Sequence, residues 1–206
     1  MTGPVVAFVR HGETAPNRAG RLLGRGDPPL TDAGLAQAAR LAAALREPQP
    51  LAVVSSPLRR ARDTAEVIAR SSGLEVEVDD RLVEIDYGEW EGQRLFDIPA
   101  DVSARWRADP TFRAPGGESL AEVGSRVARC VQDLLTRTAR DGESGVVVAV
   151  SHVSPIKAAV SWALGVGWEL TWRMHLGLAS ISRVGARPGG PYVLSFNETG
   201  HLTAPR

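Results

Sequence analysis

The sequence has one cysteine, Cys130, among 206 residues, no excess of either charge and no long apolar run. A single cysteine excludes an internal disulfide. With 24 basic and 24 acidic residues, nothing directs the whole molecule to nucleic acid or to a membrane surface. No apolar run approaches the roughly 20 residues of a membrane span, and the N-terminus lacks the charged and apolar regions of a signal peptide. We therefore expect a cytoplasmic protein with neither a nucleic-acid nor a membrane partner.

Metal-binding patterns are also missing. No group of histidines, cysteines or carboxylates has the spacing of metal ligands, so we expect no metal and no other cofactor. The length favours one domain, residues 1–206, that is large enough to bury a core. The pattern is broken from Asp97 to Pro115, and we predict a small cap at about 91–115 in which Trp106 and Phe112 pack over the sheet.

The most informative stretch is the apolar segment at residues 5–9, which stops abruptly at Arg10, His11 and Gly12. Five consecutive apolar residues rich in valine predict a strand that is buried on both faces. Arg10 and His11 would then lie at its carboxyl end, where open α/β sheets bind their ligands. Gly12 would let the backbone approach such a ligand closely.

The same arrangement returns late in the chain. Residues 146–150 form the most apolar segment, and it ends at Ser151 and His152, with the next helix expected to begin at Ser154 and Pro155. One histidine after a strand is more often structural than catalytic. Two histidines that face one crevice from two parallel strands predict a functional site.

Arginines surround this predicted crevice in the sequence. The loop at 17–29, which includes Gly24, is rich in Gly, Pro and Arg, and its place directly after His11 favours an anion-binding loop over a solvated linker. A helix predicted to start with Ser56 as its N-cap carries three arginines in its first turns. Cations at a positive helix end are unfavourable by about a few tenths of a kcal/mol each, so a bound anion would explain them. A helical wheel does not show which of Arg59, Arg60 and Arg62 would face that anion.

The remaining segments complete an alternating pattern. Thr31 is a plausible N-cap of one helix, and Ser119 and Glu122 have the spacing of a capping box at the start of another. Cys130 lies in the apolar stripe of that second helix, so we interpret it as a packing residue. Further strands are predicted at 51–54, 75–78, 178–184 and 192–196. The alternation predicts an α/β fold, a three-layer α/β/α sandwich around a mostly parallel central sheet.

Residues 10–14, Arg-His-Gly-Glu-Thr, resemble the opening motif of the histidine phosphatases, the superfamily that includes the cofactor-dependent phosphoglycerate mutases. The resemblance extends over essentially the whole chain and implies a phosphoglycerate mutase-like fold. It implies that His11 attacks phosphorus and forms a phosphohistidine, while Arg10, Arg60 and His152 hold the phosphoryl oxygens. Imidazole and guanidinium groups suit these roles chemically.

The acid that protonates the leaving group is open among Glu84, Asp86 and Glu89 on residue chemistry alone. Residues 82–88 resemble the family segment that carries the proton donor, which selects Glu84. Likewise, residues 56–64 resemble the segment that selects Arg60. Asn17 matches a position in the phosphate pocket.

Two further resemblances concern the substrate. Residues 116–119 match the family, which makes Glu118 and Ser119 candidates for substrate binding, as is Gly24 in the loop. The second histidine is usually followed by glycine, whereas this chain has Val153, whose backbone N–H could still serve. The form Ser-His-Val-x-Pro-Ile-Lys at 151–157 resembles the phosphatase domain fused to ribonuclease H in actinobacterial proteins, and ribazole-phosphatase-like proteins are also similar.

The sequence therefore predicts a metal-independent phosphomonoesterase that acts on a small-molecule phosphate ester. The alternatives are a phosphoglycerate mutase and a non-catalytic phosphate-binding module. A mutase needs a longer insertion with basic residues, but the segment between Glu84 and Gly116 has four arginines, no lysine and no adjacent arginine pair. The oligomeric state, monomer or homodimer, stays open because Trp162, Trp168 and Trp172 fit either a core or a dimer face. We interpret His175 and His201 as structural or surface residues.

Overall fold

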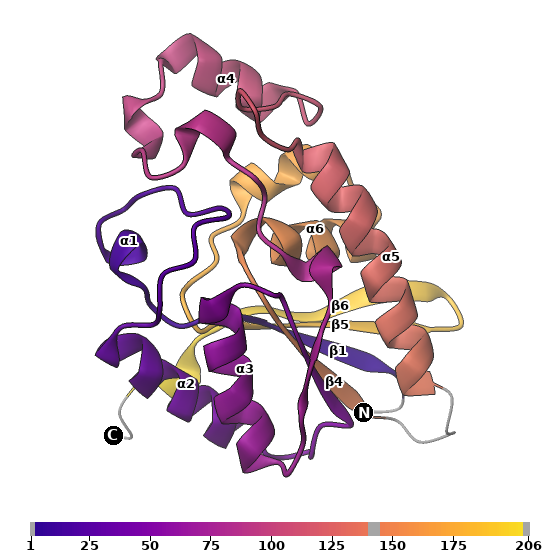
Figure 1. Ribbon diagram of the computed structural model, residues 1–206. Helices are drawn as coiled ribbons and strands as arrows, with labels where there is room; N and C mark the ends of the chain where they lie inside the picture. Colours follow the sequence, from indigo (N-terminus) through magenta and orange to yellow (C-terminus); the bar gives the residue numbers. More distant parts are fainter. Residues whose placement is uncertain (1–2, 140–144, 204–206) are drawn as a thin grey trace.

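The computed structural model describes residues 3–139 and 145–203. Six strands form one sheet in the order β3-β2-β4-β1-β5-β6 (Figure 1). The strands are β1 (Val5–Arg10), β2 (Ala52–Ser55), β3 (Val76–Val78), β4 (Val146–Ser151), β5 (Ile181–Arg187) and β6 (Gly190–Glu198). The first four strands are parallel, whereas β5 runs antiparallel to β1 and β6 antiparallel to β5. The expected mostly parallel sheet is confirmed.

The register of the two central strands places the two histidines side by side. β1 and β4 pair along their whole lengths, and the last pair is Arg10 with Ser151. His11 and His152 are the next residue of each strand, so both lie at the same edge of the sheet. Every residue of β4 and nearly all of β1 is buried, as the continuous apolar runs predict.

Helices cover both faces of the sheet (Figure 1). Helices α2 (Asp32–Ala44) and α3 (Arg59–Ser71) pack on one face, and α5 (Leu120–Ala139) and α6 (Val153–Leu164) pack on the other. This arrangement is the predicted three-layer sandwich. The remaining helices are α1 (Ala15–Arg18), α4 (Ala100–Ala108) and five 3-10 turns, at Asp80–Leu82, Gly88–Trp90, Leu95–Asp97, Trp168–Arg173 and Gly200–Leu202.

The helix starts agree only partly with the sequence. Thr31 accepts the N–H of Gly34 as the predicted N-cap of α2, and Ser119 and Glu122 form the predicted capping box of α5. The prediction for Ser56 is wrong, because α3 begins at Arg59 with Leu58 as its N-cap.

The start of α6 also differs from the prediction. The helix begins at Val153, and His152 is its N-cap residue, one position before the predicted Ser154. The backbone N–H groups of Val153 and Ser154 are free of helix partners at this end, and they bind a carboxylate described below.

A small cap stands over the carboxyl edge of the sheet and contains α4 (Figure 1). Four aromatic rings hold it together, those of Trp90, Trp106, Phe112 and Trp172. Trp106 and Phe112 therefore pack in the cap as predicted. The segment is more regular than its sequence indicates, because burial of Trp106 stabilises a helix there.

Several isolated predictions can be checked in the core. Cys130 is fully buried in the main hydrophobic cluster, so it is a packing residue. Trp162, Trp168 and Trp172 pack against the same cluster. None of the helices within residues 3–139 and 145–203 is both long enough and apolar enough to cross a membrane.

Candidate active site

His11 is buried at the carboxyl end of β1, and its hydrogen bonds define its tautomer. Nδ1 lies 2.7 Å from the carbonyl oxygen of Gly12, which can only accept, so Nδ1 carries the proton. Nε2 accepts the Nε–H of Arg60 at 3.2 Å, so this nitrogen presents its lone pair. A neutral imidazole with Nε2 unprotonated is the form that can act as a nucleophile.

Arg60 has no exposed surface, and loop carbonyls surround its guanidinium. Nη1 donates to the carbonyl of Gly26 at 2.7 Å and Nη2 to that of Gly24 at 2.9 Å. Of the three arginines in the first turns of α3, Arg60 alone contacts His11. The tertiary structure thus selects the arginine that the helical wheel left open.

Arg10 and His152 complete the crevice around His11. The rings of His11 and His152 are 5.0 Å apart. Nε2 of His152 is 2.7 Å from Oγ of Ser56, and Nη1 of Arg10 donates to the carbonyl of Leu176. Nδ1 of His152 and Nε of Arg10 are buried and have no hydrogen-bond partner among the residues that the structure describes. Buried polar atoms are normally satisfied, so the Nε–H of Arg10 can donate to an anion that enters the crevice, as can Nδ1 of His152 in the tautomer that carries its proton there.

The crevice favours negative charge. Burial, followed by the charges of Arg60 and Arg10, lowers the pKa of His11 well below 6.5, and burial likewise lowers the pKa of His152. Both imidazoles are therefore neutral at pH 7. Burial also lowers the pKa of Arg10 to about 10, which leaves its guanidinium charged at neutral pH.

Glu84 is buried and lies at the amino end of α6. Oε2 accepts the N–H of Val153 at 3.0 Å, and Oε1 accepts the N–H of Ser154 at 3.1 Å and that of Ile85 at 2.8 Å. The N–H of Val153 was expected to serve the substrate, but here it binds Glu84. Unpaired N–H groups at a helix start are suited to hold a carboxyl group in a defined place.

The other predicted acids lie differently. Asp86 accepts the N–H of Gly88, and Glu89 is exposed. Of the three candidates, only Glu84 is both buried and held by α6 next to His152. The geometry therefore agrees with the assignment that the resemblance implies.

The predicted substrate-binding residues are engaged with other protein groups. Oδ1 of Asn17 accepts the N–H and the hydroxyl of Thr14, which follows His11 by three residues. The carboxylate of Glu118 pairs with Arg126 at 2.9 Å, and Ser119 caps α5. Glu118 and Ser119 thus stabilise the fold around the site, and the structure does not bring them to His11.

Glu91 is a residue that the sequence analysis did not single out. Its carboxylate accepts three consecutive backbone N–H groups, those of Gly24, Arg25 and Gly26. The carbonyls of Gly24 and Gly26 in turn hold Arg60. The acidic character of residues 84–91 was visible in the sequence, but no pattern indicates which acid meets a loop 65 residues away.

Lys157 was also not selected. It lies one turn after Val153 on α6, and burial lowers the pKa of its ammonium group. Lys157 lines a small pocket together with Val153 and Ser154, whose N–H groups bind Glu84, so it lies near the crevice. The feature of the sequence that could have identified Lys157 is its place on the helix that directly follows His152.

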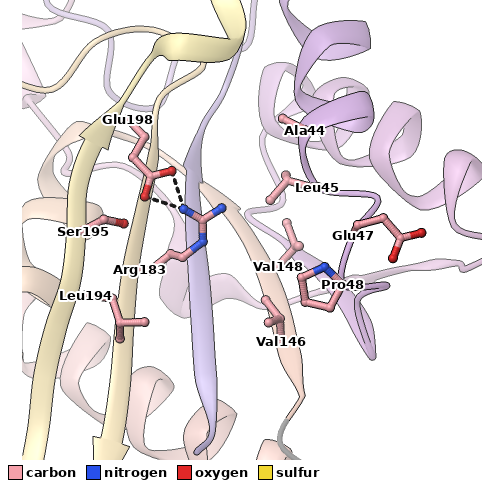
Figure 2. Close-up of a pocket in the computed structure, with 10 residues that line it drawn as sticks. All are labelled: Ala44, Leu45, Glu47, Pro48, Val146, Val148, Arg183, Leu194, Ser195 and Glu198. Atoms are coloured by element: carbon pink, nitrogen blue, oxygen red, sulfur yellow. Dashed lines mark hydrogen bonds and ion pairs between the residues drawn. The ribbon is translucent and has the colours of Figure 1, made fainter. Parts of the chain in front are cut away.

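A separate pocket of ≈ 340 Å³ lies on the α2 face of the sheet (Figure 2). Its charged residues are Glu47 and the ion pair of Arg183 with Glu198. None of its lining residues belongs to the crevice, and its arginine already has a carboxylate partner. The pocket is therefore no part of the candidate active site. Within the described parts of the chain, no group of three or more His, Cys, Asp or Glu residues could hold a metal ion.

The family model of the histidine phosphatase superfamily (branch 1) matches residues 6–199. The chain belongs to the histidine phosphatase superfamily. The resemblance that the motifs indicate is thus confirmed. The matched residues include all the side chains that form the crevice: Arg10, His11, Arg60, Glu84 and His152.

Relatives of this histidine phosphatase include several phosphatases. A bifunctional protein of Mycobacterium tuberculosis is 40% identical over 200 residues, which cover 95% of this chain and 54% of the relative. The chain thus spans about half the length of that protein. Glucosyl-3-phosphoglycerate phosphatase of Mycolicibacterium vanbaalenii is 36% identical, with 87% of this chain and 82% of the relative covered. The crystal structure of phosphoserine phosphatase from Entamoeba histolytica, in complex with 3-phosphoglyceric acid, matches with a TM-score of 0.87 and 30% identity, over 97% of this chain and all of that one.

Proposed function

We propose that the chain is a phosphomonoesterase that hydrolyses small phosphate esters through a phosphohistidine on His11. The observation that carries the proposal is the neutral Nε2 of His11 in a buried crevice that also holds the guanidinium cations of Arg10 and Arg60. A neutral nucleophile next to fixed cations suits attack on a phosphate group, because the cations stabilise charge on the phosphoryl oxygens.

In the first step Nε2 of His11 bonds to phosphorus, and the bond from phosphorus to the leaving oxygen breaks. Once Nε2 holds phosphorus it no longer accepts a hydrogen bond, so the Nε–H of Arg60 becomes available to a phosphoryl oxygen. The unpartnered Nε of Arg10 and Nδ1 of His152 can contact the same group. Protonated Glu84 would give its proton to the leaving oxygen.

In the second step Glu84, now a carboxylate, takes a proton from water, and the water oxygen attacks phosphorus. The bond to Nε2 breaks, phosphate leaves, and His11 returns to its neutral tautomer. The hydrogen bond from Nδ1 to the Gly12 carbonyl persists through both steps and keeps Nε2 directed at phosphorus.

The cap favours a hydrolase over the mutase alternative. Its four arginines are engaged within the cap or with α5: Arg94, Arg105 and Arg107 lie over aromatic rings, and Arg113 pairs with Glu122. These contacts lie within the cap and at α5 rather than at the crevice around His11. The phosphatase relatives support the same choice.

The test is phosphate release from a panel of monoesters in the presence of a chelator, beside an isomerisation assay on 3-phosphoglycerate with its bisphosphate cofactor. We expect release from several esters and none from the His11→Ala variant. Isomerisation without release would favour the mutase. Wild-type protein that is as inert as His11→Ala on the whole panel would favour the non-catalytic phosphate-binding module.

A further inference from the structure

A small pocket of ≈ 60 Å³ adjoins the proposed catalytic centre. Val153 and Ser154, whose N–H groups hold Glu84, form one side of it. The rest of the pocket is lined by Lys157 of α6, the hydroxyl-bearing Tyr87 and Thr171, the apolar Leu120, and two tryptophans, Trp106 and Trp172. The pocket therefore begins next to the carboxyl group that is proposed to protonate the leaving oxygen.

Lys157 brings a positive charge to this pocket. It is the only lysine in the sequence, and all other basic residues are arginines. It is half-buried, and no hydrogen bond or ion pair to it is found among residues 3–139 and 145–203. A lysine ammonium is a compact point charge, which suits a small pocket better than a planar guanidinium. A half-buried cation without a protein partner is favoured when a ligand supplies the opposite charge.

The two tryptophans add donors without acceptors. Nε1 of Trp106 and Nε1 of Trp172 are buried, and neither has a hydrogen-bond partner within the described ranges, 3–139 and 145–203. The two rings meet edge to face, with centroids 4.6 Å apart. A buried indole N–H usually finds an acceptor, because its desolvation is costly otherwise. The unsatisfied groups of this pocket are therefore an ammonium and two N–H donors.

We propose that this pocket binds a carboxylate of the substrate, so that the preferred substrates are alkyl phosphates with a carboxylate close to the phosphate. This inference rests on the proposed hydrolase function, since it names the substrate class of the same site. One ammonium balances the single charge of a carboxylate, whereas a second phosphate would bring almost two charges. The small volume excludes a nucleobase or a sugar ring from the pocket itself.

Matched substrate pairs test the proposal. 3-Phosphoglycerate and glycerol 3-phosphate differ at the carboxylate, as do phosphoserine and phosphoethanolamine. We expect wild-type kcat/KM to favour the carboxylated member of each pair by about tenfold or more. Lys157→Met is expected to reduce this preference on the order of 10- to 100-fold, since a hydrogen bond to a charged group is lost. Trp172→Phe, which keeps a ring but removes the N–H, is expected to reduce it about three- to tenfold.

The control is Arg107→Met, which removes a cation that lies over the ring of Trp172 and does not line the pocket. We expect this variant to keep the wild-type preference. Equal kcat/KM for both members of each pair in wild type, or an equal loss on both in Lys157→Met, would overturn the proposal. Loss of the preference for carboxylated esters in Arg107→Met would also overturn the proposal. The positive charges of the cap as a whole, and not the pocket, would then be responsible for the preference.

Binding separates this proposal from the proposed function. His11→Ala lacks the nucleophile, so calorimetry with this variant measures the affinity for intact esters. We expect 3-phosphoglycerate to bind at least about tenfold more tightly than glycerol 3-phosphate, and the double variant with Lys157→Met to lose that difference. If wild type releases phosphate from no ester, the hydrolase function fails, while the binding preference still decides the role of the pocket.

Discussion

Arg60 donates its Nε–H to Nε2 of His11 at a distance of 3.2 Å. This Nε2 is the atom that is proposed to attack phosphorus. The same guanidinium donates to the carbonyls of Gly24 and Gly26. Arg60 therefore links the nucleophile to the glycine-rich loop that follows it in the chain. Its planar fork serves both contacts at once, which a lysine cannot do.

Arg60→Lys is expected to lower kcat/KM about 100- to 1000-fold on any hydrolysed ester, because the donor next to the phosphoryl oxygens is lost while the charge remains. The control is Arg59→Lys on the same helix. The side chain of Arg59 is exposed and pairs with Asp63. We expect the control to stay within about twofold of wild type. Steady-state kinetics on p-nitrophenyl phosphate measure both. Activity of Arg60→Lys within about threefold of wild type would contradict this role.

The buried neutral histidines predict how stability depends on pH. The native pKa of His11 and of His152 lies well below the unfolded value of about 6.5, so below pH 6.5 the unfolded chain binds protons that the native protein does not. The free energy of unfolding should therefore fall with pH below 6.5, by up to about 1.4 kcal/mol per pH unit for each histidine. Urea denaturation from pH 7.5 to 5 measures this slope.

His152→Gln should have a shallower slope than wild type in this range, because one of the two buried imidazoles is gone. His175→Gln is the matched control, since His175 is exposed, and it should keep the wild-type slope. Parallel curves for wild type and His152→Gln would show that His152 is not held neutral by the fold.

Glu84→Gln tests the acid. The amide keeps one acceptor oxygen for the N–H groups at the start of α6 but cannot supply a proton to the leaving oxygen. We expect kcat to fall about 100- to 10,000-fold on an alkyl phosphate and much less on p-nitrophenyl phosphate, whose leaving group needs no acid. Glu89→Gln, which changes an exposed acid of the same segment, should leave both rates near wild type. An equal loss on both esters in Glu84→Gln would refute the assignment.

Glu91→Gln tests the support of the loop. The change takes one charged acceptor from the N–H groups of Gly24, Arg25 and Gly26, so we expect the free energy of unfolding to fall by about 1–3 kcal/mol. Because the carbonyls of this loop hold Arg60, kcat/KM should fall as well, about tenfold. Urea denaturation and steady-state kinetics check the two effects. Loss of stability without loss of activity would mean that Arg60 keeps its place without this support.

The mostly parallel sheet and the edge at which the two histidines lie follow from sequence patterns alone. Short continuous runs rich in valine favour strands that are buried on both faces, and parallel strands present their carboxyl ends at one edge. His11 and His152 each follow such a run, so their proximity could be predicted. Local caps such as Thr31 were predictable for a similar reason, since their partners lie within one helical turn.

The contacts between polar groups that lie far apart in the chain could not be predicted and became known from the fold. Ser56 was expected to cap α3, but its hydroxyl lies 2.7 Å from His152, 96 residues away. Glu91 could bind the loop at residues 24–26 only because the cap folds back over the sheet. Hydrophobic periodicity specifies which face of an element is buried, but it carries no information on the partner of a polar side chain. That partner depends on where loops and helix ends come together once the core has formed.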